Sequence, residues 1–385
     1  MSAAVTLPRA DGRLERHVLG EPAAFAPPSE PLRSRRLFAA AHVVADPLRT
    51  SVEGGALDWE ATMAFRRHLW RWGLGVADAM DTAQRGMGLD YGTTRELIER
   101  SAAEARAVGG ALVCGVGTDQ LPARAPASLD AIVAAYLEQG QHAQAHGAGV
   151  VLMASRHLAA AAHGPDDYRA VYDRVLADLD GPVVIHWLGD MFDPALAGYW
   201  GSRDLDRATE VCLDVLHANA AKIDGIKLSL LDHEREVDLR RWLPDGVRMY
   251  TGDDFHYDDL ILGDGERASD ALLGIFDAIA PAASAAVQAL DRDDADAYRA
   301  TLSPTVPLAR HLFAAPTYHY KAGIVFLAYL NGHQDHFRML GGLESARAVI
   351  HLADAFVLAD RAGLLHDPES AAGRMRAFLR LAGVS

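Results

Sequence analysis

The sequence has little of what marks exported, membrane-bound or nucleic-acid-binding proteins. Its 385 residues include two cysteines, Cys114 and Cys212, too few and too far apart for a disulfide framework or a cysteine-based zinc site. No apolar run approaches the roughly 20 residues that cross a bilayer, and the first residues lack the apolar stretch of a signal peptide. Lysine and arginine total 37 against 52 acidic residues, and the formal net charge of −15 argues against nucleic acid or an anionic membrane as partner. These absences predict a cytoplasmic protein.

Short apolar runs alternate with longer amphipathic stretches from Arg35 onward. The runs are RLFAAAHVVA, GVADAMD, ALVCGVG, GVVLMAS, PVVIHWLG, KIDGIKLS, VRMYTGDD and ALLGIFDAIA. Strand alternating with helix indicates βαβ units and a parallel sheet, and eight such runs over roughly 250 residues predict an α/β protein with a (β/α)8 TIM barrel. A doubly wound open sheet is less favoured, because the Gly-rich turn that usually follows its first strand is replaced by HVVADPLR.

The chain divides into three parts by composition. Residues 1–34 are Pro-rich and lack sustained periodicity, which predicts an N-terminal arm that is irregular or holds short extra strands. Residues 35–285 carry the alternation of strands and helices and form the predicted barrel. After Pro281 only helical patterns remain, so residues 286–385 are predicted to form a C-terminal helical region.

Polar residues that end the predicted strands are the candidates for a site, because the active site of a TIM barrel lies at the C-terminal ends of its strands. These ends meet around one rim, so side chains distant in sequence are expected to converge there. In chain order the residues are His42, Asp78, Asp81, Thr82, Ser155, Arg156, His186, Asp190, Lys227, Asp253, Asp254 and Asp277.

Lys227 is the most informative of these residues. It lies between Ile226 and Leu228 in what should be a fully buried strand, and lysine is rarely buried without a reason. In an apolar pocket the pKa of an amine falls, which frees the amine to attack a carbonyl and form a Schiff base. The structural alternative is an ion pair with an aspartate from the second or seventh strand that braces the barrel.

His186 and the Asp253–Asp254 pair each have a structural and a functional interpretation. His186 ends the run PVVIHW, where a histidine is either a hydrogen-bonded core residue or an acid–base catalyst. Acidic residues at a strand–loop junction commonly cap the next helix. Alternation along the strand lets only one of Asp253 and Asp254 face the pocket.

Two further segments are predicted to have structural roles. YGTTREL is expected to end a loop, with Thr93 or Thr94 as the N-cap of the next helix. His319, His333 and His336 form a second polar group in a helical region, where helix capping or subunit contacts are expected.

The stretch from GIKLSLLD through MYTGDD resembles the dihydrodipicolinate synthase/N-acetylneuraminate lyase family of class I aldolases. In that family a sixth-strand lysine in a G-I-K context forms the Schiff base, and a Gly-Asp turn follows strand 7. CGVGTDQL, PVVIHWLG and LARHLFAAPTYHYKAG are similar, in the same order, to the family's third strand, fifth strand and C-terminal helical segment. The resemblance extends from about Arg35 to Gly342. It implies that Lys227 is the Schiff-base residue and that no cofactor is needed.

Departures from the family's pattern indicate a divergent branch. His186 stands where the family has the tyrosine that relays protons, and a histidine can do acid–base work near neutral pH. The family's G-T-T-G-E loop, which holds the keto-acid carboxylate, reads MDTAQRGMG here. Thr82 keeps a hydroxyl and Arg85 offers a donor, whereas Asp81 adds a negative charge. True dihydrodipicolinate synthase activity is therefore not expected.

The leading hypothesis is a lyase, aldolase or dehydratase that acts on a small-molecule carbonyl substrate, either a keto acid or an oxidised sugar derivative. Lys227 forms the Schiff base and His186 moves the proton. The predicted substrate-binding residues are Thr82, Asp81, Arg85, Ser155, Asp253, Asp254 and Asp277. The resemblance also implies a homodimer or a homotetramer.

Two other classes of function stay open. A divalent metal held by His42, Asp81, His186 and Asp253 would make the barrel an isomerase or hydrolase. Against this alternative, the sequence has no HxH or HExxH motif, and a buried Lys227 would repel the cation. The second alternative is a non-catalytic ligand-binding barrel, which the missing tyrosine permits and the retained buried amine disfavours.

Overall fold

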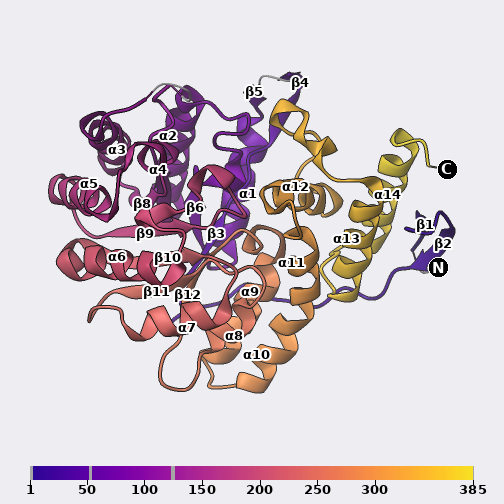
Figure 1. Ribbon diagram of the computed structural model, residues 1–385. Coiled ribbons are helices and arrows are strands. Elements are labelled where there is room, and N and C mark those ends of the chain that lie inside the picture. The colour runs from indigo at the N-terminus through magenta and orange to yellow at the C-terminus, as the bar shows by residue number, and fades with distance from the viewer. Residues whose placement is uncertain (1–2, 52–53, 123–125, 385) are drawn as a thin grey trace.

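Eight parallel strands close into a barrel in the computed structural model, which describes residues 3–51, 54–122 and 126–384 (Figure 1). Each run predicted as a strand contains one of them, so the predicted TIM barrel is confirmed. The barrel strands, in chain order around the barrel, are β3 (Leu37–Ala40), β6 (Gly75–Asp78), β7 (Leu112–Val116), β8 (Gly149–Met153), β9 (Val183–Leu188), β10 (Ile223–Ser229), β11 (Arg248–Thr251) and β12 (Asp270–Leu273).

Helices follow each barrel strand and cover the outside of the barrel (Figure 1). They are α1 (Trp59–Arg71), α2 (Tyr91–Val108), α3 (Leu129–Ala145), α4 (Arg156–Ala161), α5 (Pro165–Asp178), α6 (Leu205–Ala218), α7 (His233–Arg241), α8 (Tyr257–Leu262) and α9 (Phe276–Leu290). A short hairpin of β4 (Ala45–Ser51) and β5 (Gly54–Leu57) precedes α1.

The interior of the barrel is filled by side chains that alternate along the strands. Val151, Val184, Tyr250 and Leu272 pack together inside it. Because side chains alternate between the two faces of a strand, His186 points inward like Val184, two residues before it.

Two local expectations from the sequence are wrong. The run ALLGIFDAIA leaves the strand conformation at Leu273 and enters α9 at Phe276, so Asp277 lies in the first turn of a helix and not at a strand end. Helix α2 begins at Tyr91, and its N-cap is Asp90, whose carboxylate accepts a hydrogen bond from the N–H of Thr93. An aspartate side chain caps as well as threonine does, so the helix starts earlier than YGTTREL suggested.

The first residues form an antiparallel hairpin of β1 (Ala4–Pro8) and β2 (Leu14–Val18), one of the two forms expected for the N-terminal arm. The hairpin lies beside the last helices, far from the barrel strands in Figure 1. His17 Nε2 lies 2.7 Å from the Asp360 carboxylate, and Arg9 pairs with Asp354 at 3.4 Å. The two ends of the chain are therefore packed together.

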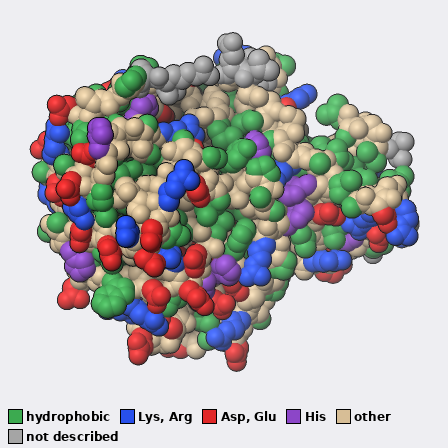
Figure 2. Space-filling model, viewed as in Figure 1, with side chains coloured by type: hydrophobic (Ala, Val, Ile, Leu, Met, Phe, Trp, Pro, Cys, Tyr) green, Lys and Arg blue, Asp and Glu red, His purple; other side chains and the backbone are tan. Residues whose placement is uncertain are grey.

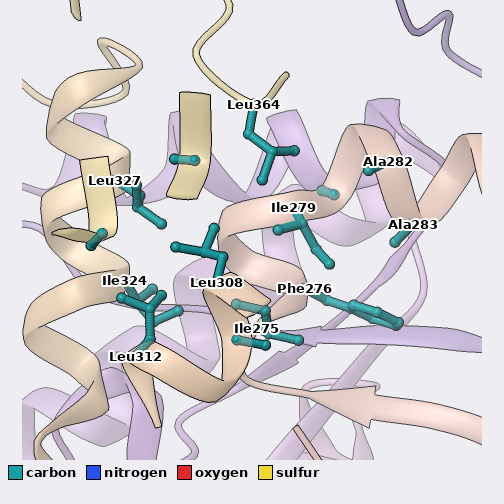
Figure 3. Packing of buried hydrophobic residues seen from close by; sticks show 14 of the residues in the cluster. Ile275, Phe276, Ile279, Ala282, Ala283, Leu308, Leu312, Ile324, Leu327 and Leu364 are labelled. Carbon is teal, nitrogen blue, oxygen red and sulfur yellow. The ribbon is translucent and has the colours of Figure 1, made fainter. Parts of the chain in front are cut away.

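The C-terminal helices share a core with the barrel. They are α10 (Ala295–Leu302), α11 (Val306–Leu312), α12 (Tyr320–Leu330), α13 (Val349–Arg361) and α14 (Pro368–Leu381). Figure 3 shows Ile279 of α9 close to Leu308 of α11 and Leu327 of α12, all fully buried or nearly so. Helix α9 is kinked at Ile279, and its second part runs through position 285 and joins the barrel to this region.

The surface carries both signs of charge. On the face shown in Figure 2, acidic and basic side chains are interspersed over the barrel. None of the helices in the described part of the chain combines the length and the apolar composition needed to cross a membrane.

Two partly buried histidines predict how stability depends on pH. His68 of α1 and His333 have ring centroids 4.3 Å apart. Burial and the neighbouring histidines lower the pKa of His68 to about 3, and burial with His42 and His366 lowers that of His333 to about 4. In the unfolded chain both histidines take up a proton near pH 6.5, whereas in the folded protein they stay neutral to a lower pH. The free energy of unfolding is therefore highest above pH 6.5 and falls as the pH falls towards 4, because protonation favours the unfolded chain.

Between pH 6.5 and 5, the free energy of unfolding of His68→Phe should therefore fall by about 1–2 kcal/mol less than that of the wild type. Urea unfolding at several pH values measures the difference. His163→Gln, at an exposed position, is the control and should keep the wild-type slope. Equal slopes for His68→Phe and wild type would contradict the assignment.

Candidate active site

Lys227 points into the barrel near the C-terminal end of β10. Its neighbours in the strand register are His186 on β9 and Tyr250 on β11. The side chain is buried, and burial lowers the pKa of its amine against the attraction of Asp81 and Asp254. A lowered pKa increases the share of neutral amine, the form that attacks a carbonyl.

Two glycines make room for this lysine and its surroundings. A Cβ at Gly225 would lie 2.7 Å from Cε2 of Tyr250, whose ring fills the barrel and whose hydroxyl donates to Asp224 at 2.6 Å. A Cβ at Gly252 would lie 2.1 Å from Oγ of Ser229 and 3.0 Å from Cε of Lys227. Close packing therefore explains the glycine in GIK and the one before the aspartate pair.

The two consecutive aspartates have different surroundings. Asp253 accepts hydrogen bonds from the N–H groups of Phe255 and His256, and its other oxygen lies 2.9 Å from Nδ1 of His256. Asp254 is buried, accepts from the N–H of Ile275 at 2.9 Å and interacts with Lys227. Burial raises the pKa of the Asp254 carboxyl, so it retains its proton to a higher pH than an ordinary aspartate.

Helix α12 contributes two further groups, Tyr320 and Lys321. The Tyr320 hydroxyl lies 2.6 Å from Oγ1 of Thr82 and donates to Oδ2 of Asp81 at 2.9 Å. Nζ of Lys321 lies 3.4 Å from the same carboxylate oxygen. Burial opposes ionisation of Asp81, but the ammonium groups of Lys321 and Lys227 and the Tyr320 hydrogen bond outweigh it and lower the Asp81 pKa.

Lys321 of α12 is a buried amine, as Lys227 is. Burial lowers the pKa of Lys321, and the attraction of Asp81 opposes the shift. Burial and the Asp81 charge raise the pKa of Tyr320, which keeps its hydroxyl protonated. A phenol in that state can give a proton to one neighbour while it takes one from another.

His186 is buried at the other side of Lys227. Its Nε2 lies 3.1 Å from Oγ of Ser229, and its Nδ1 has no hydrogen-bond partner among the described residues. Burial and the charge of Lys227 lower the pKa of His186 well below its usual value, so the imidazole is neutral.

Arg85 is placed near the rim, but its guanidinium is already satisfied. Its five N–H donors are directed to the carboxylate of Asp119, the amide oxygen of Gln139, and the carbonyl oxygens of Ala79 and Gly115. Binding a substrate carboxylate would require breaking one of these bonds. Arg85 was predicted to donate a hydrogen bond to the substrate, but all of its N–H groups already have partners within the protein.

Other predicted residues have structural partners. The Ser155 hydroxyl caps α4 by accepting from the N–H of Leu158 and lies 2.7 Å from Oγ1 of Thr118. Asp277 accepts from the N–H of His42 at 2.7 Å and lies 2.8 Å from Nδ1 of the same histidine.

Asp78 and His333 also lie outside the Lys227 cluster. The Asp78 carboxylate pairs with the buried guanidinium of Arg66 at 2.8 and 3.1 Å and accepts from Ser101. Asp78 therefore holds α1 and α2 against the barrel. The ring of His333 packs against those of His68 and Phe65.

The four residues of the metal alternative are separated by their partners. His42 pairs with Asp277 and lies 3.2 Å from Oε1 of Gln334, whereas Asp253 pairs with His256. Within the described ranges, no three His, Cys, Asp or Glu side chains are arranged as a metal-binding group. The charges of Asp81 and Asp254 act on the amine of Lys227 instead.

The fold is that of the dihydrodipicolinate synthase-like barrels, as the resemblance implied. A putative dihydrodipicolinate synthetase from Pseudomonas aeruginosa is 15% identical with a TM-score of 0.62, covering 83% of this chain and 99% of that chain. YagE, a prophage protein of that family from E. coli K12 in complex with pyruvate, is 13% identical with a TM-score of 0.64, covering 91% and 99%. Dihydrodipicolinate synthase from Aquifex aeolicus is 14% identical with a TM-score of 0.60, covering 91% and 98%.

By sequence, the chain belongs to the family DUF993, described as a protein of unknown function, whose profile matches residues 5–384. A comparison with curated proteins found no match. At 13–15% identity the solved structures establish the shared fold and leave the reaction open.

Sequence reasoning missed Tyr320 and Lys321 as members of the site. Both lie in LARHLFAAPTYHYKAG, which resembles a helical segment of the family but lies outside the eight strand ends. One signal was available: the chain has three lysines, Lys222, Lys227 and Lys321, among its 37 basic residues. In a chain that otherwise uses arginine, an amine within an apolar helix indicates a specific role.

The contact at Gly252 gives a stability prediction. Gly252→Ala would place its Cβ against the Leu228 carbonyl at 2.8 Å as well as Ser229 and Lys227, so the free energy of unfolding should fall by about 1–3 kcal/mol. Urea unfolding measures the loss. The matched control is Gly373→Ala in α14, where nothing lies within 4 Å and a gain of about 0.5–1 kcal/mol is expected. Wild-type stability of Gly252→Ala would contradict the packing argument.

Proposed function

We propose that the protein is a Schiff-base-forming lyase, an aldolase or dehydratase, that acts on a small keto acid or related oxo compound. The observation that carries the proposal is the buried amine of Lys227 near the C-terminal end of β10, next to His186 and Tyr250 in the strand register. The fold shared with dihydrodipicolinate synthases supports it, because their class I chemistry uses a lysine at this strand.

The proposed reaction begins when the neutral amine of Lys227 attacks the carbonyl carbon and gives a carbinolamine. The carbinolamine loses water to form an iminium ion, which draws electrons from the adjacent carbon–carbon or carbon–hydrogen bond. Bond cleavage, or loss of a hydroxyl group as water, then leaves a lysine-bound product. A protonated Asp254 is a suitable acid for the departing oxygen, because its raised pKa keeps the proton on it near neutral pH.

We propose Tyr320 as the group that moves the proton, in preference to His186. Its hydroxyl bridges Thr82 and Asp81, and Asp81 interacts with Lys227. The neutral imidazole of His186 is hydrogen-bonded to Ser229 and is a poor acid with its lowered pKa. Tyr320 would thus restore from a C-terminal helix the tyrosine that the family carries on its fifth strand.

We also propose that the protein catalyses a reaction other than that of dihydrodipicolinate synthase. Asp81 is ionised at the position of the family's carboxylate-binding loop, and Arg85 is fully paired. Lys321 and Arg156 are the other cations that line this rim. We propose Lys321, which lies 3.4 Å from Asp81, as the partner for a substrate carboxylate. The cytoplasmic location and the assembly into a homodimer or homotetramer stay predictions.

Borohydride trapping tests the Schiff base. Intact protein incubated with 2-oxo acids and borohydride should gain one adduct, mapped by peptide mass spectrometry to Lys227, and Lys227→Ala should lose it completely. Lys222→Ala, which changes a lysine paired with the Leu179 carbonyl outside the site, should keep it. Adducts on Lys222, or an unchanged yield in Lys227→Ala, would refute the assignment.

Hydrogen exchange tests the proton relay. Enamine formation exchanges the protons next to the carbonyl of pyruvate with D2O, and NMR follows the rate. Tyr320→Phe should slow this exchange by about 10²-fold, because general acid–base groups contribute about that much. His186→Gln should slow it less than tenfold. A larger decrease of the exchange rate in His186→Gln than in Tyr320→Phe would show that His186 moves the proton.

A further inference from the structure

A cavity of about 610 Å³ adjoins the Lys227 cluster at the C-terminal ends of β6, β7, β8 and β9. Asp81 and Lys321 line it and pair with each other at 3.4 Å, and the charge of Lys227 acts on Asp81. A ligand whose carbonyl reaches Lys227 past Asp81 would extend the rest of its chain into this space.

The charged side chains in the cavity wall are already paired with one another. Arg85 binds both carboxylate oxygens of Asp119, at 2.9 and 2.6 Å. Arg156 pairs with Asp193 through Nε, so the charge of each guanidinium is balanced by a carboxylate.

The hydroxyl groups of the wall are also paired. Oγ1 of Thr118 lies 2.7 Å from Oγ of Ser155 and 2.9 Å from Nδ1 of His157. Ser155 accepts in addition from the N–H of Leu158 at 3.0 Å. A polyhydroxylated chain in the cavity would have to break these bonds to gain its own, which gives little net affinity.

The rest of the wall is mainly apolar. Side chains from four loops and strand ends contribute, and the largest are Met87, Leu121, Met153, Leu188, Phe192 and Leu196. A cavity of about 150 Å³ already holds a benzene molecule, so this one has room for an aryl ring or a branched alkyl chain with part of its linker. Transfer of each further methylene from water to such a wall raises affinity about fourfold.

We propose that this cavity binds an apolar substituent of the carbonyl substrate, so that the substrates are 2-oxo acids with an alkyl or aryl chain and not sugar acids. The inference rests on the proposed Schiff-base function for the reacting carbonyl and on the cavity wall for the substituent. In this arrangement Lys321 and Lys227 contact the polar end of the substrate, and the apolar wall of the cavity contacts its tail.

A series of 2-oxo acids tests the proposal by the concentration that half-saturates borohydride trapping at Lys227. The series is pyruvate, 2-oxohexanoate, 4-phenyl-2-oxobutanoate and 2-oxogluconate. We expect 4-phenyl-2-oxobutanoate to half-saturate at a concentration at least 30-fold lower than pyruvate or 2-oxogluconate. Equal half-saturation by all four acids, or a preference for 2-oxogluconate, would overturn the proposal.

Variants localise the preference to the cavity. Ala154→Leu adds bulk at a residue that lines it, and should lower the preference for the phenyl compound over pyruvate at least tenfold. Ala107→Leu adds the same bulk at an exposed position of α2 and should keep the wild-type preference. If Ala154→Leu does not fold, Gly117→Ala replaces it, because a Cβ there would lie 3.5 Å from Cε of Met153, an ordinary contact. An unchanged preference in a folded cavity variant would overturn the proposal.

A ligand without a carbonyl separates this inference from the proposed function. Binding of 4-phenylbutanoate, measured by calorimetry, requires the cavity but no Schiff base. Binding that Ala154→Leu weakens, together with no adduct from any oxo acid, would support the cavity and refute the lyase. Adducts at Lys227 with no binding of 4-phenylbutanoate would support the lyase and refute the apolar cavity.

Discussion

The site depends on the cost of burying charge at the end of a closed barrel. A buried ammonium group is tolerated only with compensating charges and hydrogen bonds nearby, and the charges of Asp81 and Asp254 raise the pKa of Lys227 against the effect of burial. Lys321 adds a second amine beside Asp81. These four residues come from β10, the loops after β6 and β11, and α12, so the compensation joins distant parts of the chain.

The C-terminal helices are part of the site for this reason. The ring of Tyr320 stacks on Phe313 with centroids 4.2 Å apart and meets Phe192 edge-on. Burial of α12 among α9 and α11 holds its first turn over the barrel, as the packing in Figure 3 shows for Ile324 and Leu312. A helix that is apolar nearly all around thus carries the two polar groups that reach Asp81.

The rim joins groups from distant parts of the chain. Asp81, in the loop after β6, accepts a hydrogen bond from Tyr320 of α12 and pairs with Lys321 of the same helix. Charges at the entrance are neutralised in pairs, Arg85 with Asp119 and Arg156 with Asp193. Neutralised pairs leave the apolar side chains to decide what binds, which is why specificity is expected to follow hydrophobic area.

Local sequence patterns were sufficient to predict the barrel and the burial of Lys227 in its sixth strand. Eight apolar runs predicted the strands because each strand is buried on both faces, and Lys227 stood out because an amine in such a run needs an explanation. Alternation likewise predicted that only one of Asp253 and Asp254 faces the pocket, and the two carboxylates do have different partners, Asp253 with His256 and Asp254 with the N–H of Ile275. The sequence by itself therefore determined the architecture and the position of the buried lysine that we propose as the reactive amine.

Only the tertiary structure decided which polar groups meet that amine. Tyr320 and Thr82 are 238 positions apart, and no local period relates them. Arg85 was expected to bind the substrate and Asp277 to end a strand, yet the Arg85 guanidinium is paired with Asp119 and Asp277 lies in the first turn of α9. Hydrogen bonds and ion pairs between distant segments form wherever packing brings the groups together, and that packing is a property of the whole fold.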